Sequence, residues 1–452
     1  NVRCFYANNY CAKNADGSLQ LTVPEGKRMQ LRGTTLVDQG GHLVIYDGSD
    51  GDEKLIDVQN GKAYEYNTLI SSGNTVTFDL KNGDRGEKVD FTVIVFDQSE
   101  TPKIEIASVE GGTVSASADI TVGKPVTLNI SPKEGFWLKS LNVVDAFGNL
   151  FRVRSASSFA KTATFMMPAS NVTVTPTFTD NLTAAGGLYV YMPFGETTSV
   201  TVPTGVTSFK VTKADETNTN ADSYLELIST ETNKLFQVTA RPSLKDGDSL
   251  TIFDGNVNAE KLLSSLSTGG GVDRGGYSYI GPLVSSGPLM TIKLKATDDY
   301  SRDYIDNFVV TVGESGNHVV KFADYAGGMI VTESASVKTG SKVNFSIIPD
   351  EGYVLKSISA KDDDGRTVVL NGASEFCSSS SFTMGLSDVT ITPVFEKKLS
   401  AKEGLEVNIP SYNETRTVNV PLEVTSLKVD LSSQSYGSIK KGCLVLNASE
   451  GF

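Results

Sequence analysis

Residues 187–312 contain GLYVYMP (187–193), VTSFKV (206–211), DSYLELI (222–228), GDSLTIFDG (247–255) and LVSSGPLMTIKL (283–294). Their apolar and polar residues alternate, a pattern typical of β-strands. The opening segments recur in 404–452 as GLEVNIP (404–410), VTSLKV (424–429) and CLVLNASEG (443–451). The later segments recur in 1–97 as GSLQLTVPEG (17–26), GGHLVIYDG (40–48) and LISSGNTVTFDL (69–80). We therefore predict a repeated module, here called A. It is complete at 187–313 (central A module), lacks its first strands at 1–97 (first A module) and contains only its first strands at 404–452 (C-terminal A segment).

A second repeated unit, called B, alternates with module A. The segment VEGGTVSAS (109–117) corresponds to YAGGMIVTE (325–333), and NVTVTPTF (171–178) corresponds to DVTITPVF (388–395). Repeats of this kind indicate an array of similar structural units. We predict small β-domains at 103–180 (first B module) and 319–397 (second B module), so the chain is expected to resemble beads on a string.

Short alternating runs separated by Gly, Pro and Asn predict an all-β fold. In module A, the segment closest to helical spacing is AEKLLSSL (259–266), which is long enough for one or two turns at most.

Composition excludes several classes of function. The formal net charge of -13 at pH 7 argues against binding to nucleic acids or anionic membranes, because both need a basic surface. No apolar run reaches the roughly 18 to 20 residues of a membrane-spanning helix. An acidic surface is typical of an extracellular or cell-surface protein.

The cysteines do not indicate a zinc site or a disulfide-rich scaffold. Cys4 and Cys11 are close enough to close a short loop, whereas the repeats assign no partner to Cys377 or Cys443. Each of the latter two is either a small buried apolar residue or part of a disulfide. The chain has two histidines, no CxxC pair and hence no expected zinc site.

Module A resembles a CUB domain, a jelly-roll β-sandwich. The resemblance is carried by a series of motifs: Pro-Glu-Gly between two apolar strands, then DxLxIxDG, SSGxxxTxxL and an FxVxV closing strand. Residues 19–95 contain this order, and residues 225–312 follow its later part. Module B resembles the divergent internalin B-type bacterial repeat through Gly111-Gly112, KEGF (133–136) and FMMP (165–168). The second copy departs at Gly385, where that pattern has proline. This combination is similar to large surface proteins of Bacteroidetes-type bacteria, and it implies CUB-like sandwiches alternating with small β-repeat domains.

Motifs for catalysis are not apparent in the sequence. Serine in SSG (71–73 and 285–287) is not part of a GxSxG elbow, and His42 and His318 do not occupy equivalent repeat positions. A Ser-His-Asp triad is therefore not expected. The acidic pairs lie in polar loops, where solvated charge is the usual state. We predict a protein that is not an enzyme.

One candidate metal site follows from the CUB resemblance. Many CUB domains hold calcium with an Asp before the DxLxIxDG strand and an Asp after the SSG strand, because calcium prefers several carboxylate oxygens. Asp248 matches the first position, and Asp298 or Asp299 matches the second. Gly41 replaces Asp248 in the first A module. The alternative is an ordinary polar loop without a cofactor.

Some aromatic residues allow a weaker interpretation as a carbohydrate platform. Trp137 is expected to point away from its own core, against an adjoining module or into solvent, because the neighbouring Phe136, matched by Tyr353, is expected to face the core. Val354 stands in the place of Trp137 in the second B module. Tyr277 and Tyr279, matched by Tyr64 and Tyr66, are expected to pack as alternating strand residues.

We therefore expect a non-enzymatic, extracellular structural or adhesive repeat protein, a stalk, filament subunit or adhesin. The incomplete A modules are expected to be completed by flanking modules of a longer array or by neighbouring copies, head to tail. Receptor contacts, including host or environmental glycoconjugates, are expected on loops 213–222 and 256–281. The alternative is the carbohydrate- or glycoprotein-binding region of a larger secreted enzyme.

Overall fold

The computed structural model describes most of residues 15–448. The segments outside the described residues in that range are 38–39, 50, 60–61, 84–87, 194, 214–220, 243, 245–246, 257, 260, 268–278, 297–307, 374–376, 398–399, 404, 410–414, 421–423 and 432–442. The chain forms two compact units, one ending at Tyr191 and the other beginning at Met192.

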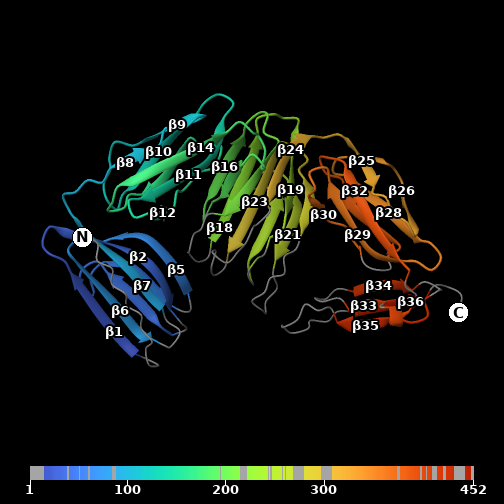
Figure 1. Cartoon of the computed structure of the whole chain (residues 1–452), viewed down its shortest axis with the longest axis horizontal. Helices are drawn as coiled ribbons and strands as arrows, with labels where there is room; N and C mark the ends of the chain where they lie inside the picture. The colour runs from blue at the N-terminus through green and yellow to red at the C-terminus, as the bar shows by residue number, and fades with distance from the viewer. Residues whose placement is uncertain are drawn as a thin grey trace. The chain divides into compact units, whose positions relative to one another are not determined.

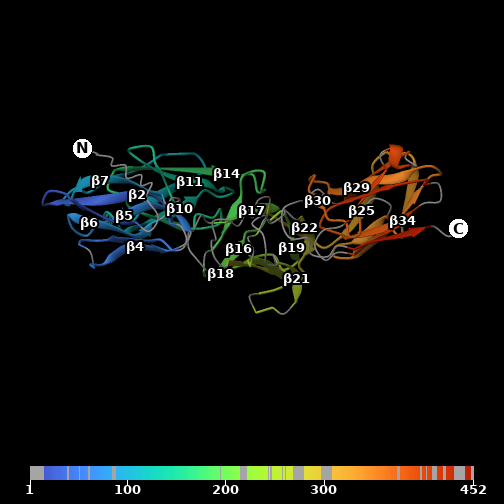
Figure 2. The same cartoon turned by 90° about the horizontal axis from the view of Figure 1, so that it is seen from below.

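The described part of the central A module is a sandwich of two five-stranded sheets. Its strands are β15 (Tyr189–Met192), β16 (Thr197–Val202), β17 (Ser208–Lys213), β18 (Ala221–Ser229), β19 (Lys234–Ala240), β20 (Ser249–Phe253), β21 (Leu262–Ser267), β22 (Ile280–Val284), β23 (Leu289–Ala296) and β24 (Val309–Glu314). One sheet has the order β15-β17-β24-β19-β22 and the other β16-β18-β23-β20-β21 (Figure 1). Figure 2 shows the two sheets as separate layers. The prediction of an all-β fold is confirmed.

The strand β21 corrects one expectation. It covers most of the AEKLLSSL segment, for which the sequence suggested at most a short helix, and it pairs antiparallel with β20 from Ser249↔Ser267 to Phe253↔Leu262. A six-residue segment gains little from isolated helix formation, so pairing with a neighbouring strand determines its structure.

The first A module repeats the last seven strands of the central sandwich. They are β1 (Ala15–Thr22), β2 (Lys27–Val37), β3 (His42–Tyr46), β4 (Lys54–Gln59), β5 (Lys62–Ile70), β6 (Thr75–Gly83) and β7 (Lys88–Asp97). The sheet orders β1-β6-β3-β4 and β5-β2-β7 match β18-β23-β20-β21 and β22-β19-β24 strand for strand.

The C-terminal A segment repeats the opening of the same sandwich. After the 3-10 helix η2 (Ala401–Glu403) come β33 (Glu406–Ile409), β34 (Thr415–Val420), β35 (Lys428–Leu431) and β36 (Cys443–Ala448). The strands β34 and β36 pair in parallel, as β16 and β18 do in the central module.

Each B module has two small sheets. The first contains β8 (Ile104–Ile106), β9 (Gly112–Ala116), β10 (Pro125–Pro132), β11 (Trp137–Asp145), β12 (Leu150–Phe151), β13 (Thr162–Met166) and β14 (Val172–Thr179). They form sheets β13-β10-β9 and β12-β11-β14-β8.

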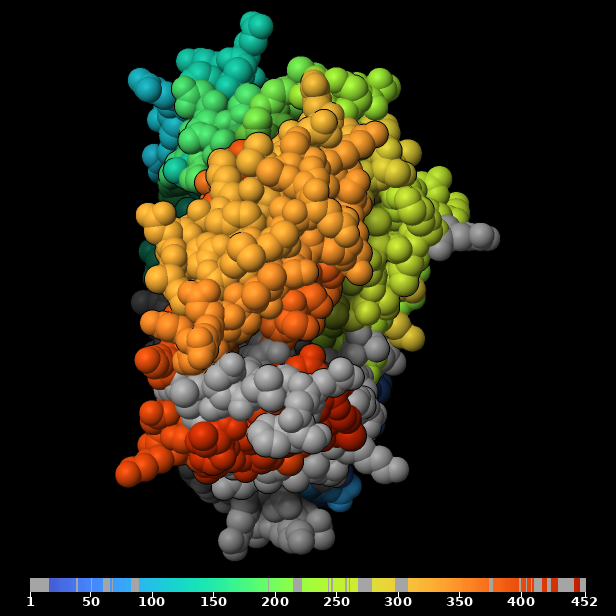
Figure 3. Space-filling view, turned by 90° about the vertical axis from the view of Figure 1, so that its right-hand side faces the viewer, coloured from blue at the N-terminus to red at the C-terminus, as the bar shows by residue number. Residues whose placement is uncertain are grey.

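The second B module contains β25 (Asn317–Phe322), β26 (Gly328–Thr332), β27 (Ser336–Lys338), β28 (Lys342–Pro349), β29 (Val354–Asp362), β30 (Thr367–Val368), β31 (Ser379–Thr383) and β32 (Val389–Glu396). Its sheets are β27-β25-β32-β29-β30 and β26-β28-β31. The face of this module in Figure 3, drawn in orange, is rounded and has no deep hollow.

The core of each B module follows from strand alternation. Val343, Phe345 and Ile347 of β28 are buried, while the residues between them are exposed, because successive side chains of a strand point to opposite faces. The same pattern buries Val126, Leu128 and Ile130 of β10.

The Gly-Gly motif of each B module is explained by a neighbouring aromatic ring. Gly327 has φ +90°, and a Cβ there would lie 2.5 Å from Cδ1 of Tyr353. Gly111 has φ +86°, and a Cβ there would lie 2.6 Å from Cδ1 of Phe136. The KEGF (133–136) and DEGY (350–353) motifs therefore each place an aromatic ring against a glycine that has no room for a side chain.

No helix in the described part of the chain is long and apolar enough to cross a membrane.

We predict that Gly327→Ala destabilises the second B module more than Gly340→Ala. Gly340 has φ +79° but nothing within 4 Å of the added Cβ, so its substitution costs only the left-handed conformation, about 1–2 kcal/mol. Gly327→Ala adds a clash with Tyr353, which costs about 1–3 kcal/mol more. Calorimetric unfolding of both variants measures the difference, and equal losses of stability would contradict this explanation.

Candidate functional site

The residues proposed for calcium are only partly described. Asp248 lies directly before β20, and its side chain is fully buried. Asp298 and Asp299 lie outside the described residues. Among the residues that the structure does describe, no group of three His, Cys, Asp or Glu side chains is placed to hold a metal ion. Calcium binding by Asp248, Asp298 and Asp299 therefore stays a prediction.

The first serine of each SSG motif is a structural residue. Ser285 Oγ accepts a hydrogen bond from the Phe236 N–H at 2.9 Å and donates one to the Gly287 carbonyl at 2.7 Å. Ser71 Oγ makes the same two bonds, with Met29 and Gly73, at 2.9 and 2.7 Å. Both serines are buried. Each hydroxyl thus satisfies one backbone group of the SSG loop and one of the neighbouring strand, β19 or β2.

The aspartate of each Asp-Gly turn holds the same loop. Asp254 Oδ1 accepts the Ser286 N–H at 2.7 Å, and both carboxylate oxygens of Asp47 accept the Ser72 N–H at 2.8 and 2.9 Å. Burial raises the pKa of Asp254, but its hydrogen bonds with Lys261 and Ser286 lower the pKa by more. The pKa of Asp254 therefore lies below its ordinary value. Asp254 is therefore ionised at neutral pH, and its negative charge strengthens the hydrogen bond with the Ser286 N–H.

A threonine completes this arrangement in both copies. Thr291 Oγ donates to the Gly255 carbonyl at 2.8 Å, and Thr77 Oγ donates to the Gly48 carbonyl at 2.7 Å. The signature residues of module A thus form one repeated polar network. Their positions are explained by backbone hydrogen bonding and do not require a catalytic function.

The two histidines make different surface contacts. His42 Nε2 lies 2.6 Å from Asp57 Oδ1, and Lys54 pairs with the other oxygen of Asp57 at 2.6 Å. His318 Nδ1 lies 3.9 Å from Asp388 Oδ1 in the second B module. They occupy unrelated positions, as the sequence predicted.

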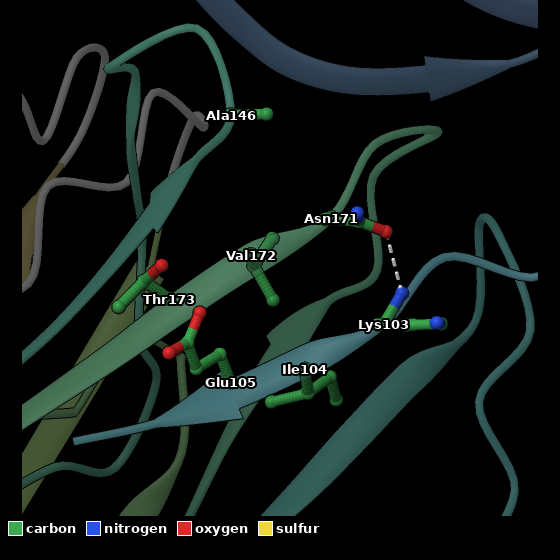
Figure 4. Close-up of a pocket in the computed structure, with 7 residues that line it drawn as sticks. All are labelled: Lys103, Ile104, Glu105, Ala146, Asn171, Val172 and Thr173. Atoms are coloured by element: carbon green, nitrogen blue, oxygen red, sulfur yellow. Dashed lines mark hydrogen bonds between the residues drawn. The ribbon is translucent and has the colours of Figure 1, made fainter.

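A shallow pocket of about 490 Å³ lies on the first B module (Figure 4). It is lined by Lys103, Ile104, Glu105, Ala146, Asn171, Val172 and Thr173. Asn171 Oδ1 accepts the Lys103 N–H at 2.8 Å, and in the second B module Asp388 Oδ1 accepts the Val319 N–H at the same distance. This repeated bond fixes the start of β8 or β25 beside the adjacent strand. Most of the lining side chains are exposed, which is typical of a surface depression and unsuited to enclosing a substrate.

Trp137 is half-buried and lies edge-on to Phe159, with the ring centroids 5.6 Å apart. Its equivalent Val354 is buried in a cluster with Leu405, Val407 and Val418 of the C-terminal A segment. This position of module B therefore contacts the following A strands in the second copy. The aromatic contact of Trp137 is with Phe159 of its own module, so the expected contact of Trp137 with an adjoining module or solvent stays a prediction.

Residues between β12 and β13 of the first B module bind the first strand of the next module. Ser158 N donates to the Tyr189 carbonyl at 2.9 Å, and its Oγ accepts the Tyr189 N–H at 2.9 Å. Ser157 Oγ accepts the Tyr191 N–H at 3.0 Å, and Tyr191 packs against the first B core. Burial raises the pKa of Tyr189. The sequence analysis missed these serines, because nothing in a Ser-Ser pair distinguishes a module contact from a loop.

The remaining candidate side chains are placed as follows. Tyr66 packs in the first A core and stacks on Phe91 at 5.9 Å, which fits the expected packing role. Tyr279 is exposed beneath the Arg241 guanidinium, whose Cζ lies 5.0 Å from the ring centroid. Cys443 is an exposed free thiol, and Cys377 packs against the second B core. Cys4, Cys11 and Tyr277 lie outside the described residues.

Comparisons with known proteins support the assignment of the B modules. Residues 103–182 and 318–399 match the family model of the divergent InlB B-repeat domain. No curated protein matches the chain. The resemblance of the two B segments to that repeat is confirmed.

Solved structures with some similarity include two CUB-containing proteins and one pilin. The CUB1-EGF-CUB2 domain of human MASP-1/3 is 11% identical, with coverage of 67% of this chain and 94% of that chain and a TM-score of 0.19. The CUB1-EGF-CUB2 domains of rat MASP-1 are 11% identical, with coverage of 67% of this chain and 92% of that chain and a TM-score of 0.18. The major pilin protein (T3.2) of Streptococcus pyogenes serotype GAS13637 is 9% identical, with coverage of 86% of this chain and 99% of that chain and a TM-score of 0.10. These scores are too low to support any argument about this chain.

We predict that Ser285→Ala lowers the stability of the central A module by about 1–3 kcal/mol, because it leaves the Phe236 N–H and the Gly287 carbonyl without their buried partner. The matched control is Ser286→Ala, since the exposed Ser286 contributes its backbone N–H, which the substitution keeps. Calorimetry measures both. A Ser285→Ala variant as stable as the Ser286→Ala variant would contradict the structural role of the SSG motif.

Proposed function

We propose that this chain is an extracellular structural repeat protein that acts as a stalk or spacer. The observation that carries the proposal is the contact between each B module and the A strands that follow it. In a stalk, the units must hold a fixed arrangement under load, and this requires bonded contacts in place of flexible linkers.

The contact in the first compact unit consists of three hydrogen bonds and apolar packing. Ser157 and Ser158 form hydrogen bonds with the backbone of Tyr189 and Tyr191. The strand β15 of the central sandwich is therefore also bonded to the first B module. Hydrogen bonds of this kind contribute about 0.5–1.5 kcal/mol each. Leu188 and Val190, beside these tyrosines, are fully buried. Separation of Tyr189 and Tyr191 from the first B module would therefore break these backbone bonds.

The contact in the second compact unit uses apolar residues. Val354 of the second B module shares a buried cluster with Leu405 and Val407. Leu405 directly precedes β33, and Val407 lies within it. Two chemically different contacts, from different positions of module B, thus join a B module to the A strands that follow it. This supports a role for the junction itself and not only for its individual residues.

Surface charge and family resemblance support an extracellular location. A net charge of -13 favours solubility and opposes adsorption to anionic surfaces. The B modules resemble a repeat of the internalin B type. The SSG and Asp-Gly motifs of module A are explained by backbone hydrogen bonding. A non-enzymatic stalk of a bacterial surface protein, with an adhesive role carried by loops of module A, accounts for these features.

We also propose that the incomplete A modules are completed by strands from flanking modules or neighbouring copies. Leu19 of β1 is 44% exposed, whereas the equivalent Leu225 in the central sandwich is 0% exposed. Val429 of β35 is 44% exposed, whereas the equivalent Val211 of β17 is 2% exposed. Strands of the β33–β35 type, placed on residues 15–97, would bury both surfaces as in the central module.

Small-angle X-ray scattering of the 452-residue chain over a concentration series tests this function. A compact protein of this length would have a radius of gyration of about 22 Å, and a stalk should exceed this value clearly. The apparent mass should rise with concentration if neighbouring copies complete the exposed modules. A radius close to that of a compact protein at all concentrations would contradict the spacer function.

A further inference from the structure

One side chain in the first A module and one in the central A module depart from the burial expected for their strands. Gln237 lies in β19 between Phe236 and Val238, whose side chains point into the sandwich core. Because strand residues alternate, Gln237 points to the outer face of its sheet, where a polar residue is normally solvated. It is nevertheless only 2% exposed. Another part of the protein must therefore cover the outer face at this point.

The first A module has the same feature at the same position. Gln30 lies in β2 between Met29 and Leu31 and is 1% exposed. Gln30 pairs with Ile70 and Ile94, as Gln237 pairs with Val284 and Thr311 in the equivalent strands. The two glutamines are equivalent in both fold and register.

Each glutamine accepts a hydrogen bond from the B module that follows it. The Ala169 N–H donates to Gln30 Oε1 at 2.6 Å, and the Leu386 N–H donates to Gln237 Oε1 at 2.5 Å. Ala169 and Leu386 follow the FMMP and FTMG segments at the same point of the two B modules. The A-to-B junction therefore contains one repeated polar bond, here called the glutamine contact.

The loop of the second B module lies close to the sandwich at Gly385, the position that Pro168 occupies in the first B module. A Cβ at Gly385 would overlap Oε1 of Gln237, and it would lie 3.3 Å from Cβ of Pro282. The backbone of the second B module thus packs closely against Gln237 at this glycine, whereas the first glutamine contact forms with Pro168 at the same point.

Further bonds hold the same junction in the second compact unit. The Val369 N–H donates to the Gly281 carbonyl at 3.0 Å, and Arg366 Nη1 donates to Thr311 Oγ at 2.7 Å. Thr311 is the residue that pairs with Gln237 on the neighbouring strand. The loops of the second B module thus bind the outer face of the sheet at several points around the glutamine.

We propose that the outer face of the β22-β19-β24 sheet, and of its equivalent β5-β2-β7, is the binding surface for the B module that follows, with the buried glutamine as its specificity-determining residue. The glutamine recognises the backbone N–H after the FxM[P/G] segment, so each A module binds its B module in one register. This inference relies on the proposed spacer function for its biological use, but its geometry does not depend on that function.

Hydrogen exchange of the full chain, measured by mass spectrometry on peptides that contain Leu386 or Ala169, tests the proposal. Gln237→Met keeps the length of the side chain but removes the amide acceptor. The Leu386 amide should then exchange about 5- to 30-fold faster, the factor that corresponds to the loss of one such contact. The Ala169 amide should be unchanged, since Gln30 is intact. Gln30→Met should give the reverse result.

Gln237→Glu is the conservative control, because its carboxylate still accepts the N–H, and it should keep the slow exchange of Leu386. Unchanged exchange of Leu386 in a folded Gln237→Met variant would overturn the proposal. Faster exchange of both amides together would also overturn it, because it would mean that the glutamine supports the sandwich and not the junction. Scattering distinguishes the two proposals: an extended particle without the local exchange effect rejects the glutamine contact but keeps the spacer function.

Discussion

This structure depends on one constraint. Backbone groups that are buried where sheets and modules meet must have hydrogen-bond partners. A β-sandwich hides one face of each sheet by itself, but every loop that crosses from one sheet to the other carries N–H and C=O groups away from water. An unpaired buried group costs more than a hydrogen bond contributes. Ser71 and Ser285 meet this requirement within module A, and Gln30 and Gln237 meet it where module B covers the sandwich.

The same constraint changes the interpretation of the sequence motifs. Serine, aspartate and threonine in the SSG and Asp-Gly motifs are residue types that also occur in active sites. Here both copies direct them to backbone atoms at closely similar distances. Because the same bonds appear twice, they are properties of the fold. A repeat protein thus provides its own comparison, in which shared contacts indicate structure and differences such as Trp137 against Val354 indicate local adaptation.

Much of the fold could be predicted because repeats and alternation are local in sequence. The Gly-Gly and KEGF motifs indicated the resemblance to the internalin B-type repeat, and the structure explains them by the rings of Phe136 and Tyr353 beside the glycines. Gln30 and Gln237 were not predicted to matter, since a polar residue at an outward strand position looks solvated until the covering module is known. The signal was present, because glutamine lies between apolar residues in both MQL and FQV. The calcium residues Asp298 and Asp299 could not be tested, as they lie outside the described residues.

Taken together, these contacts describe A–B pairs that are joined by buried polar bonds and not by loose connections. The most direct test is the distance between spin labels on the exposed residues Thr232 of the central A module and Asn344 of the second B module, measured by pulsed electron paramagnetic resonance after the four native cysteines are replaced by alanine. The account predicts one narrow distance distribution, with an unchanged narrow distribution for a control pair on Asn344 and Asp363 within the second B module. A broad distribution for the first pair beside a narrow one for the control would show that the modules move independently, and it would contradict the account.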